Sequence, residues 1–198
     1  MQAEHDRECA GTPVTSSTTT SSADTLTVWT IGHSTRSVAE LMVALAPYGI
    51  ETVADVRRFP GSRRLPHFAG PELRTSLEAQ GLSYVWIPAL GGRRRPLKDS
   101  ENTAWRHEAF RGYADHVESE EFAEGLFELL MVARGLRTAV MCAEVLWWRC
   151  HRRLIADVLT SLGMTVVHIA DATHAQPHVL SAPARMERGV LRYDAVSS

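Results

Sequence analysis

Two cysteines in the second half of the chain are surrounded by residue types that favour thiol chemistry. Cys142 ends an apolar run, and Cys150 is followed by His151 and Arg152 in the stretch MCAEVLWWRCHRR. Cationic neighbours stabilise a thiolate and so lower the pKa of a cysteine. We therefore regard Cys142 as the candidate reactive group. The alternative is that Cys142 is a small buried hydrophobic residue at the end of a strand.

Cys150 is expected at the beginning of a helix, where free backbone N–H groups and the helix dipole also favour a thiolate. Its alternative role is that of a half-buried cap residue. The two cysteines are too far apart in sequence for a CxxC redox pair. With Glu144 and His151 they form a set of metal-ligating types, but their spacing matches no zinc pattern. The sequence therefore predicts no metal site, and it identifies no cofactor.

Three further side chains are candidates for moving protons. Asp55 comes two residues before the pair Arg57 and Arg58, Glu144 follows Cys142 by two residues, and His33 lies in the tripeptide GHS. Carboxylates and imidazoles are the usual general acids and bases of enzymes, and histidine titrates near neutral pH. Each has a structural alternative, because a carboxylate can instead fix an arginine and a histidine can instead stabilise a turn.

Arginines are concentrated in a few short stretches. Of the 21 basic residues 20 are arginines, and half of these lie in 57–64, 93–95 and 149–153. Guanidinium groups suit the recognition of phosphates and carboxylates. We therefore expect an anionic ligand that arginines hold and that the backbone approaches at small residues. The predicted ligand-binding residues are Gly32, Ser34, Arg57, Arg58, Arg63, Gly91, Gly92, Arg149, Cys150, His151 and Arg152.

The elements that must position these residues alternate between strand and helix. Apolar runs predict strands at 26–31, 51–56, 83–88, 137–142 and 164–169, and helical periodicity predicts helices at 37–49, 71–81, within 106–134 and at 150–163. Strands that are apolar throughout are typical of a parallel sheet covered on both faces. We predict an α/β fold, with a single three-layer domain and a mostly parallel five-stranded sheet. Its strand carboxyl ends share one edge, where ligands bind.

Composition sets the expected boundaries of the domain. Residues 1–25 are rich in Ser and Thr and predict a disordered tail, the α/β domain is expected over 26–180, and 181–198 form a C-terminal extension. Residues 170–198 are expected to be irregular. No apolar run reaches the length of a membrane span, and the first residues lack the apolar core of a secretory signal. We therefore expect a cytoplasmic protein that does not contact membranes.

The motifs IGHSTRS, DVRRFPGSRR, PHF, LGG, FRGYADH, MCAE and WRCHRRLIAD resemble, in this order, those of the domain-of-unknown-function 488 family. The resemblance covers roughly residues 28–180. It implies a compact α/β domain whose shared residues lie at one edge, and it implies no settled reaction. The segment VLWW replaces the short polar or proline-containing segment of the ordinary family pattern. This departure would either restrict access to Cys142 or give the site a stacking surface.

Our leading hypothesis is an enzyme-like domain that binds an anionic, phosphate- or nucleotide-like ligand at the carboxyl edge of the sheet. Whether the protein is an enzyme stays open. The alternative is a non-catalytic module that binds nucleic acid through its arginine loops, with stacking on Phe59, Trp86, Trp105, Trp147 and Trp148. Without residues 1–25 the net charge is +1, from 20 basic and 19 acidic residues, and this near-neutral charge argues against it, because nucleic-acid-binding domains are usually basic. A third hypothesis is a structural domain whose arginines form internal ion pairs.

Overall fold

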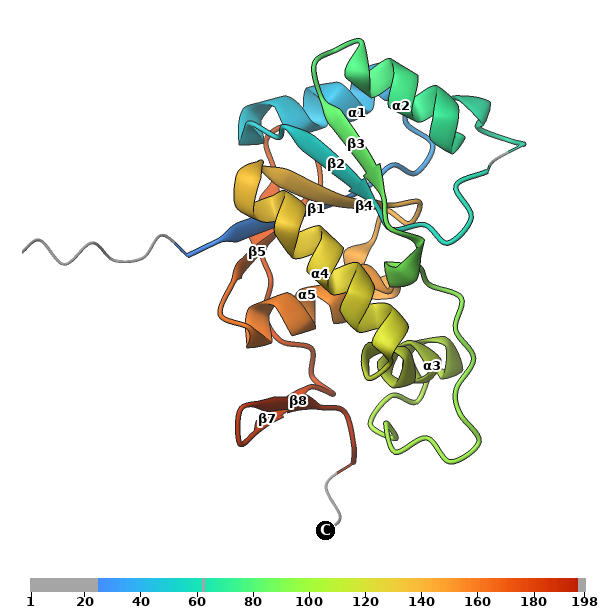
Figure 1. The fold of residues 1–198 in the computed structure, drawn as a ribbon, viewed down its shortest axis with the longest axis vertical. Helices are drawn as coiled ribbons and strands as arrows, with labels where there is room; N and C mark the ends of the chain where they lie inside the picture. The colour runs from blue at the N-terminus through green and yellow to red at the C-terminus, as the bar shows by residue number, and fades with distance from the viewer. Residues whose placement is uncertain (1–24, 62, 196–198) are drawn as a thin grey trace, which may run out of the picture.

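The computed structural model describes residues 25–61 and 63–195 and shows a sheet between two layers of helices (Figure 1). The tail predicted over 1–25 lies, apart from Thr25, outside the described residues. The strands are β1 (Thr27–Gly32), β2 (Thr52–Asp55), β3 (Ser83–Trp86), β4 (Thr138–Cys142), β5 (Thr165–Ile169), β6 (Ala175–Pro177), β7 (Arg185–Glu187) and β8 (Val190–Arg192). The helices are α1 (Val38–Leu45), α2 (Gly70–Glu78), α3 (Glu108–Val117), α4 (Glu120–Gly135) and α5 (Arg152–Ser161).

The main sheet has the strand order β3-β2-β4-β1-β5-β6. Its first five strands are parallel, as predicted, and β6 pairs antiparallel with β5 at the edge. The predicted three-layer α/β fold is therefore confirmed, but the sheet has six strands rather than five. The prediction of an irregular segment over 170–198 was wrong, because this segment contains β6 and the β7–β8 hairpin.

Successive side chains of the inner strands enter opposite cores. In β2, Val53 packs with the residues of α1 and α2, whereas Ala54 packs with those of α3, α4 and α5. In β4, Met141 and Cys142 divide in the same way. This alternation follows from the pleat of a strand and explains why the strands are apolar at nearly every position. It also places α1 and α2 on one face of the sheet and the other three helices on the opposite face (Figure 1).

Local signals explain where the helices begin. Ser37 and Glu40 form the predicted capping box at the start of α1, in which each side chain accepts a hydrogen bond from the backbone of the other residue. Ser119 caps α4 by accepting from the N–H of Phe122. The predicted helix at 150–163 begins later, at Arg152, after a single 3₁₀ turn over Trp147–Arg149. Cys150 therefore lies just before the amino end of α5.

The C-terminal segment packs against the domain. Tyr193 is only 3% exposed, and its ring centroid lies 5.7 Å from that of Trp105. Its hydroxyl donates a hydrogen bond of 3.0 Å to the buried carboxylate of Asp157.

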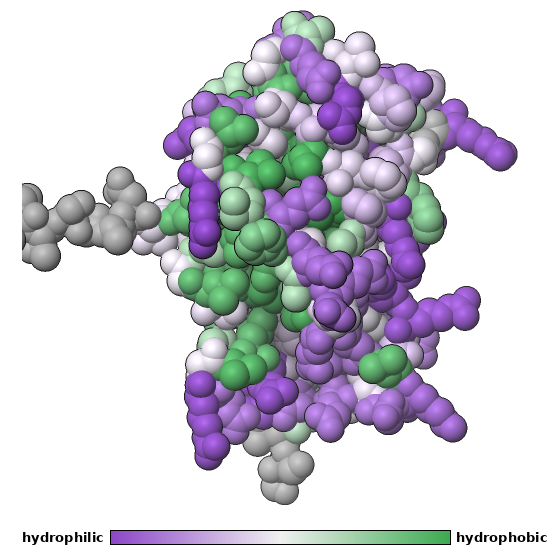
Figure 2. Space-filling view, in the orientation of Figure 1, coloured by the Kyte–Doolittle hydropathy of each residue, from purple (hydrophilic) through white to green (hydrophobic). Residues whose placement is uncertain are grey.

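Figure 2 shows hydrophobic side chains gathered on the face that carries α4, whereas hydrophilic side chains surround α3. Phe127 and Met131 of α4 are exposed. Across the described ranges, no helix combines the length and apolar character that a membrane crossing requires.

Candidate functional site

A cavity of about 310 Å³ lies at the carboxyl ends of the parallel strands. It adjoins a second cavity of about 780 Å³, since both are lined by Ser34, Arg93, Cys142, Ala143 and His151. None of the described residues that line the smaller cavity is acidic. They come from the segments after β1, β2, β3 and β4 and from the start of α5: His33, Ser34, Arg57, Arg58, Phe59, Gly61, Leu65, Gly92, Arg93, Cys142, Ala143 and His151.

The ends of β1 and β4 are held together by backbone contacts. His33 N–H donates to the carbonyl of Cys142 at 2.9 Å, and Ser34 N–H donates to that of Ala143 at 3.0 Å. A Cβ atom at Gly32 would lie 2.0 Å from the carbonyl oxygen of Glu144. Gly32 therefore permits close contact between two protein segments rather than with a ligand. The backbone N–H groups of His33 and Ser34 are engaged within the protein, and ligand binding at Gly32 stays a prediction.

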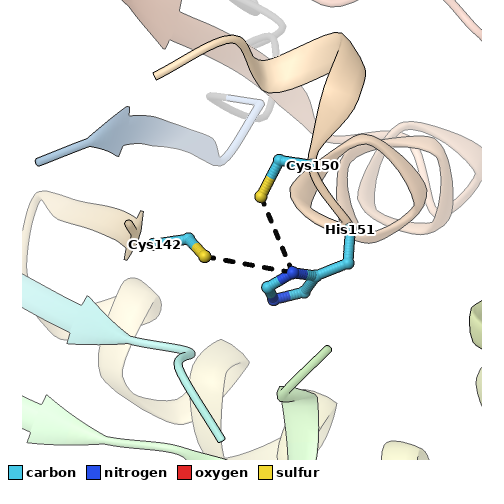
Figure 3. A group of neighbouring side chains, drawn as sticks. All are labelled: Cys142, Cys150 and His151. Atoms are coloured by element: carbon cyan, nitrogen blue, oxygen red, sulfur yellow. Dashed lines mark hydrogen bonds between the residues drawn. The ribbon is translucent and has the colours of Figure 1, made fainter. Parts of the chain in front are cut away.

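Cys142, Cys150 and His151 form a compact cluster beside both cavities (Figure 3). His151 Nδ1 lies 3.6 Å from Cys150 Sγ and 4.0 Å from Cys142 Sγ. His151 Nε2 lies 3.2 Å from the carbonyl oxygen of Val56, so Nε2 carries the proton and donates it there. Nδ1 then presents its lone pair to the two sulfur atoms. Sequence spacing predicted no metal site, but the fold brings these three ligand atoms within 4.8 Å of one another.

The two thiols differ in acidity because of their surroundings. The interaction with the Cys142 thiol, together with the charge of Arg152, lowers the pKa of Cys150 well below its ordinary value, although burial opposes this. The same interaction, together with burial, raises the pKa of Cys142. Cys150 is therefore the cysteine whose thiolate form is favoured, whereas the sequence predicted Cys142 as the reactive group. Both belong to one cluster, and both thiols are free and buried.

Arg152 lies behind this cluster rather than in the smaller cavity. Its side chain is buried, donates from Nε to Cys150 Sγ at 3.4 Å, and donates from Nη2 to the carbonyl oxygen of Glu144. No carboxylate of the described residues forms an ion pair with Arg152. Because a buried charge requires a partner, this guanidinium supports a thiolate at Cys150. Arg152 is therefore a neighbour of the thiols and lines neither of the two cavities beside them.

A buried hydrogen-bonded chain leads from Arg152 to Asp157. Arg152 Nη1 donates to Thr30 Oγ1 at 3.4 Å, and Thr30 Oγ1 lies 2.7 Å from His168 Nδ1. His168 Nε2 lies 3.0 Å from His178 Nδ1, and His178 Nε2 donates to the carboxylate of Asp157 at 2.8 Å. Burial and the neighbouring His178 lower the pKa of His168 to about 3. This chain of hydrogen bonds cannot be read from the sequence, because its members are far apart along it.

Asp55 serves to position Arg57. The guanidinium of Arg57 donates to both carboxylate oxygens of Asp55, at 2.8 Å from Nε and 2.5 Å from Nη2, and Tyr84 donates to the same carboxylate at 2.8 Å. Asp55 is fully buried and does not line the cavity. The structural alternative for Asp55 therefore describes it better than the role of general base. The charge of Arg57 is neutralised by this pair.

The remaining predicted residues differ in whether they line one of the two cavities. Arg58 lines the smaller cavity, and Arg149 and Glu144 line the larger one. Glu144 also accepts a hydrogen bond from the N–H of Leu146. Arg63 is exposed and lines neither of these two cavities. The site therefore gathers most, but not all, of the predicted arginines.

The two glycines after β3 make room for site residues. A Cβ at Gly91 would lie 2.6 Å from that of Arg58, and a Cβ at Gly92 would lie 2.7 Å from His151 Nδ1. Both glycines are therefore required by neighbouring side chains. Gly92 in particular lets the imidazole of His151 take the position from which it faces the thiols. Gly92 also lines the smaller cavity, and the prediction that both glycines let the backbone approach a ligand stays a prediction.

Several site residues were not predicted. Arg93 lines both cavities, and its backbone φ of 63° lies in the left-handed region, which a non-glycine residue seldom adopts. The predicted residue Ser34 also lines both cavities, and its φ of 51° lies in the same region. Such strained residues are frequent at functional sites. Phe110 and Tyr113 of α3 line the larger cavity. The motif FRGYADH was the sequence signal that could have identified these two residues.

The tryptophans divide between core and surface. Trp105 is buried, so it is unavailable for stacking on a nucleic-acid base, and Trp147 stacks on His168 with 4.0 Å between ring centroids. Trp86 and Trp148 are partly exposed. Trp148 lines a third cavity, which lies beside His168 and Gln176 and contains neither cysteine. The predicted aromatic surface near Cys142 therefore faces a different hollow.

Comparison with known proteins identifies the family. A family model described as "Domain of unknown function DUF488" matches residues 37–159, which include Cys142, Cys150 and His151. No curated protein and no solved structure matches the chain. Because the match covers more than half of the 198 residues, the chain belongs to the DUF488 family, as the motifs predicted.

Proposed function

We propose that the protein is an enzyme-like domain that binds an anionic, phosphate- or nucleotide-like ligand in the cavity at the carboxyl edge of the sheet. The cluster of Cys142, Cys150 and His151 is its reactive centre. The observation that carries this proposal is the composition of the smaller cavity, which is lined by three arginines and two histidines and, among the described residues, by no acid. Such a lining attracts negative charge.

Two of these arginines keep their charge available for a ligand. Arg57 is paired with Asp55, but neither Arg58 nor Arg93 has an acidic partner among the described residues. Arg58 lies 5.8 Å from the ring centroid of Phe59, and Arg93 is exposed. Like charges that line one cavity repel each other. Binding of an anion between Arg58 and Arg93 removes this repulsion and forms charge-assisted hydrogen bonds.

The size and the rim of the cavity favour a small ligand. A volume of about 310 Å³ is close to the lower end of the range for small-molecule sites, about 300–1,000 Å³. Phe59 lines this cavity with a side chain that is 66% exposed, which suits stacking of a nucleobase. A nucleotide would thus place its phosphate against the arginines and its base against the phenyl ring.

Nucleic-acid binding is the alternative function, and it has less support. A tract for a single strand needs several exposed aromatic side chains along a basic groove. Trp105 is buried and Trp147 stacks on His168, so Phe59 and Trp86 are left near the arginine loop. A steep dependence of affinity on salt would favour a polymer that releases many counterions, whereas one phosphate group predicts a shallow dependence.

Calorimetric titration of the full chain with inorganic pyrophosphate at low salt tests the proposal. We expect Arg58→Gln and Arg93→Gln each to weaken binding by about tenfold, because each removes a charge-assisted contact worth about 1.5 kcal/mol. Arg134→Gln is the matched control. It removes the same charge from the exposed last turn of α4, which leads to the opposite edge of the sheet. Equal weakening by the control, or the absence of pyrophosphate binding to the parent chain, would refute the proposal.

A further inference from the structure

We infer that Cys142, Cys150 and His151 bind one thiophilic divalent metal ion, such as Zn²⁺. Their ligand atoms lie within 4.8 Å of one another, with sulfur-to-nitrogen distances of 3.6 and 4.0 Å. Zinc bonds of about 2.3 Å to sulfur and about 2.0 Å to nitrogen give tetrahedral edges of about 3.6 Å between sulfur and nitrogen. The two sulfur-to-nitrogen distances are therefore close to those edges, and the two sulfur atoms lie within 4.8 Å of each other.

The imidazole is fixed in the tautomer that a metal ligand needs. His151 Nε2–H donates to the carbonyl oxygen of Val56 at 3.2 Å, which leaves the lone pair of Nδ1 directed at the two sulfur atoms (Figure 3). Metal-binding histidines almost always donate their second ring N–H to a carbonyl or carboxylate, which orients the ring and raises its basicity. Gly92 supports the same orientation, because any larger residue there would push against Nδ1.

The charges around the cluster suit deprotonated thiols. Arg152 Nε–H donates to Cys150 Sγ at 3.4 Å, and the guanidinium has no carboxylate partner among the described residues. N–H donors to sulfur are part of the outer shell that holds metal-bound thiolates. Two thiolates balance the charge of a divalent ion, so the positive charge of Arg152 remains.

The fourth ligand position opens into the cavities. All three residues line the larger cavity, and Cys142 and His151 also line the smaller one, so an ion has a path to the site. The cluster holds no fourth metal-ligating side chain among the described residues. Three protein ligands with one open position are typical of catalytic rather than structural zinc sites, and Cys₂His is a known catalytic set. The open position faces the cavity that we propose for the anion.

Titration of the metal-free, fully reduced chain with Co²⁺ in phosphate-free buffer tests this inference. We expect one ion per chain, a thiolate-to-cobalt charge-transfer band and the visible bands of four-coordinate cobalt. Zn²⁺ should displace the cobalt, because it binds such sites more tightly. Cys142→Ser, Cys150→Ser and His151→Ala should each weaken cobalt binding by about 100-fold or more, since loss of an outer-shell partner alone costs about 10–100-fold.

Cys9→Ser is the matched control, because it removes the third thiol of the chain, and it should leave the cobalt spectrum unchanged. If circular dichroism shows that a variant does not fold, the test uses the parent chain instead and measures whether Zn²⁺ protects its cysteines from alkylation. Zn²⁺ should then slow alkylation of Cys142 and Cys150, read by mass spectrometry, without slowing that of Cys9. A parent chain without the charge-transfer band, or cysteine variants that keep it at full strength, would overturn the metal site. Failure to bind pyrophosphate would not affect these readouts and would refute only the proposed function.

Discussion

At the scale of single residues, His33 is held neutral by its neighbours. Arg57 donates to His33 Nε2 at 3.2 Å, and His33 Nδ1 donates to the carbonyl oxygen of Ser34 at 2.9 Å. The ring stacks on Phe68 with 3.9 Å between centroids. Burial, together with the charge of Arg57, lowers the pKa of His33 to about 4. At neutral pH, His33 is therefore a fixed neutral part of the cavity wall whose lone pair is already engaged.

This environment predicts acid sensitivity. A histidine with an ordinary pKa of about 6.5 when unfolded and about 4 when folded binds more protons in the unfolded state between these values, so stability is lost as pH falls through this window. His168, with its pKa lowered to about 3, adds to the loss. We expect the free energy of unfolding, measured with urea, to fall from pH 6.5 to pH 4. His33→Gln should show a shallower fall, and His174→Gln, at an exposed histidine, should not.

If the two variants and the parent chain lost stability in parallel over this pH range, the description of His33 as a buried neutral residue would be wrong. The comparison is made on differences between pH values, so it does not depend on how much each substitution destabilises the protein at neutral pH. His168 stays in all three proteins and sets the slope that remains in His33→Gln.

Most residues of the site could be predicted from the sequence, but their roles could not. Cys142, Cys150 and His151 stood out by type, and the fold brings them together. Whether a carboxylate such as Asp55 reacts or supports depends on what packs against it. The hydroxyl that engages Asp55 comes from Tyr84 on another strand, so sequence reasoning could not decide between the two roles.

At the scale of elements, the site depends on the contact between the segments that follow β1 and β4. Gly32 ends β1 opposite Cys142, and the backbone of Glu144 passes directly over it. We expect Gly32→Ala to destabilise the protein by about 3 kcal/mol or more, because the clash of 2.0 Å is with backbone that cannot rotate away. Urea unfolding measures this cost.

Gly135→Ala is the control for this substitution. Gly135 ends α4, has open space around its Cα, and should gain up to about 1 kcal/mol from the better helix propensity of alanine. Equal urea midpoints for the two variants would contradict the account of how β1 and β4 meet.

The buried carboxylate of Asp157 joins α5 to the C-terminal segment. Its oxygens accept hydrogen bonds from His178, from the N–H of Ser181 and from the hydroxyl of Tyr193. Asp157→Asn should cost about 1–3 kcal/mol, because the amide turns one acceptor into a donor that faces other donors. Thermal unfolding of Asp157→Asn beside Asp99→Asn, at an exposed aspartate, checks this. Matching transition temperatures would show that the carboxylate does not anchor the segment.

The elements were predictable where their patterns are strong. The five parallel strands and the capping box of α1 follow from apolar runs and from Ser37 and Glu40. β6 was missed because all three of its residues are exposed, so buried and exposed side chains do not alternate along it. The β7–β8 hairpin was also missed, since its strands have three residues each and its turn contains Arg188 with a φ of 51°.

At the scale of the whole molecule, strand order explains why the cavity lies where it does. β1 and β4 are neighbours, but β1 leads into α1 on one face of the sheet and β4 leads into α5 on the other (Figure 1). Connections that leave adjacent strands toward opposite faces open a crevice between them, and ligands of open α/β sheets bind there. The smaller cavity lies at this edge and is lined by residues that follow β1, β2, β3 and β4. The sequence predicted the edge, but strand order, which places the crevice on that edge, could not be read from it.

We propose that Arg58 and Arg93 form an anion site in this crevice, beside the thiol cluster. A crystal structure of the full chain grown with tungstate, a heavy analogue of phosphate, tests it most directly. We expect an anomalous peak inside the cavity, in contact with at least one of these guanidinium groups and next to Cys142. A cavity without a peak, with both guanidinium groups bound to carboxylates of the protein itself, would contradict it.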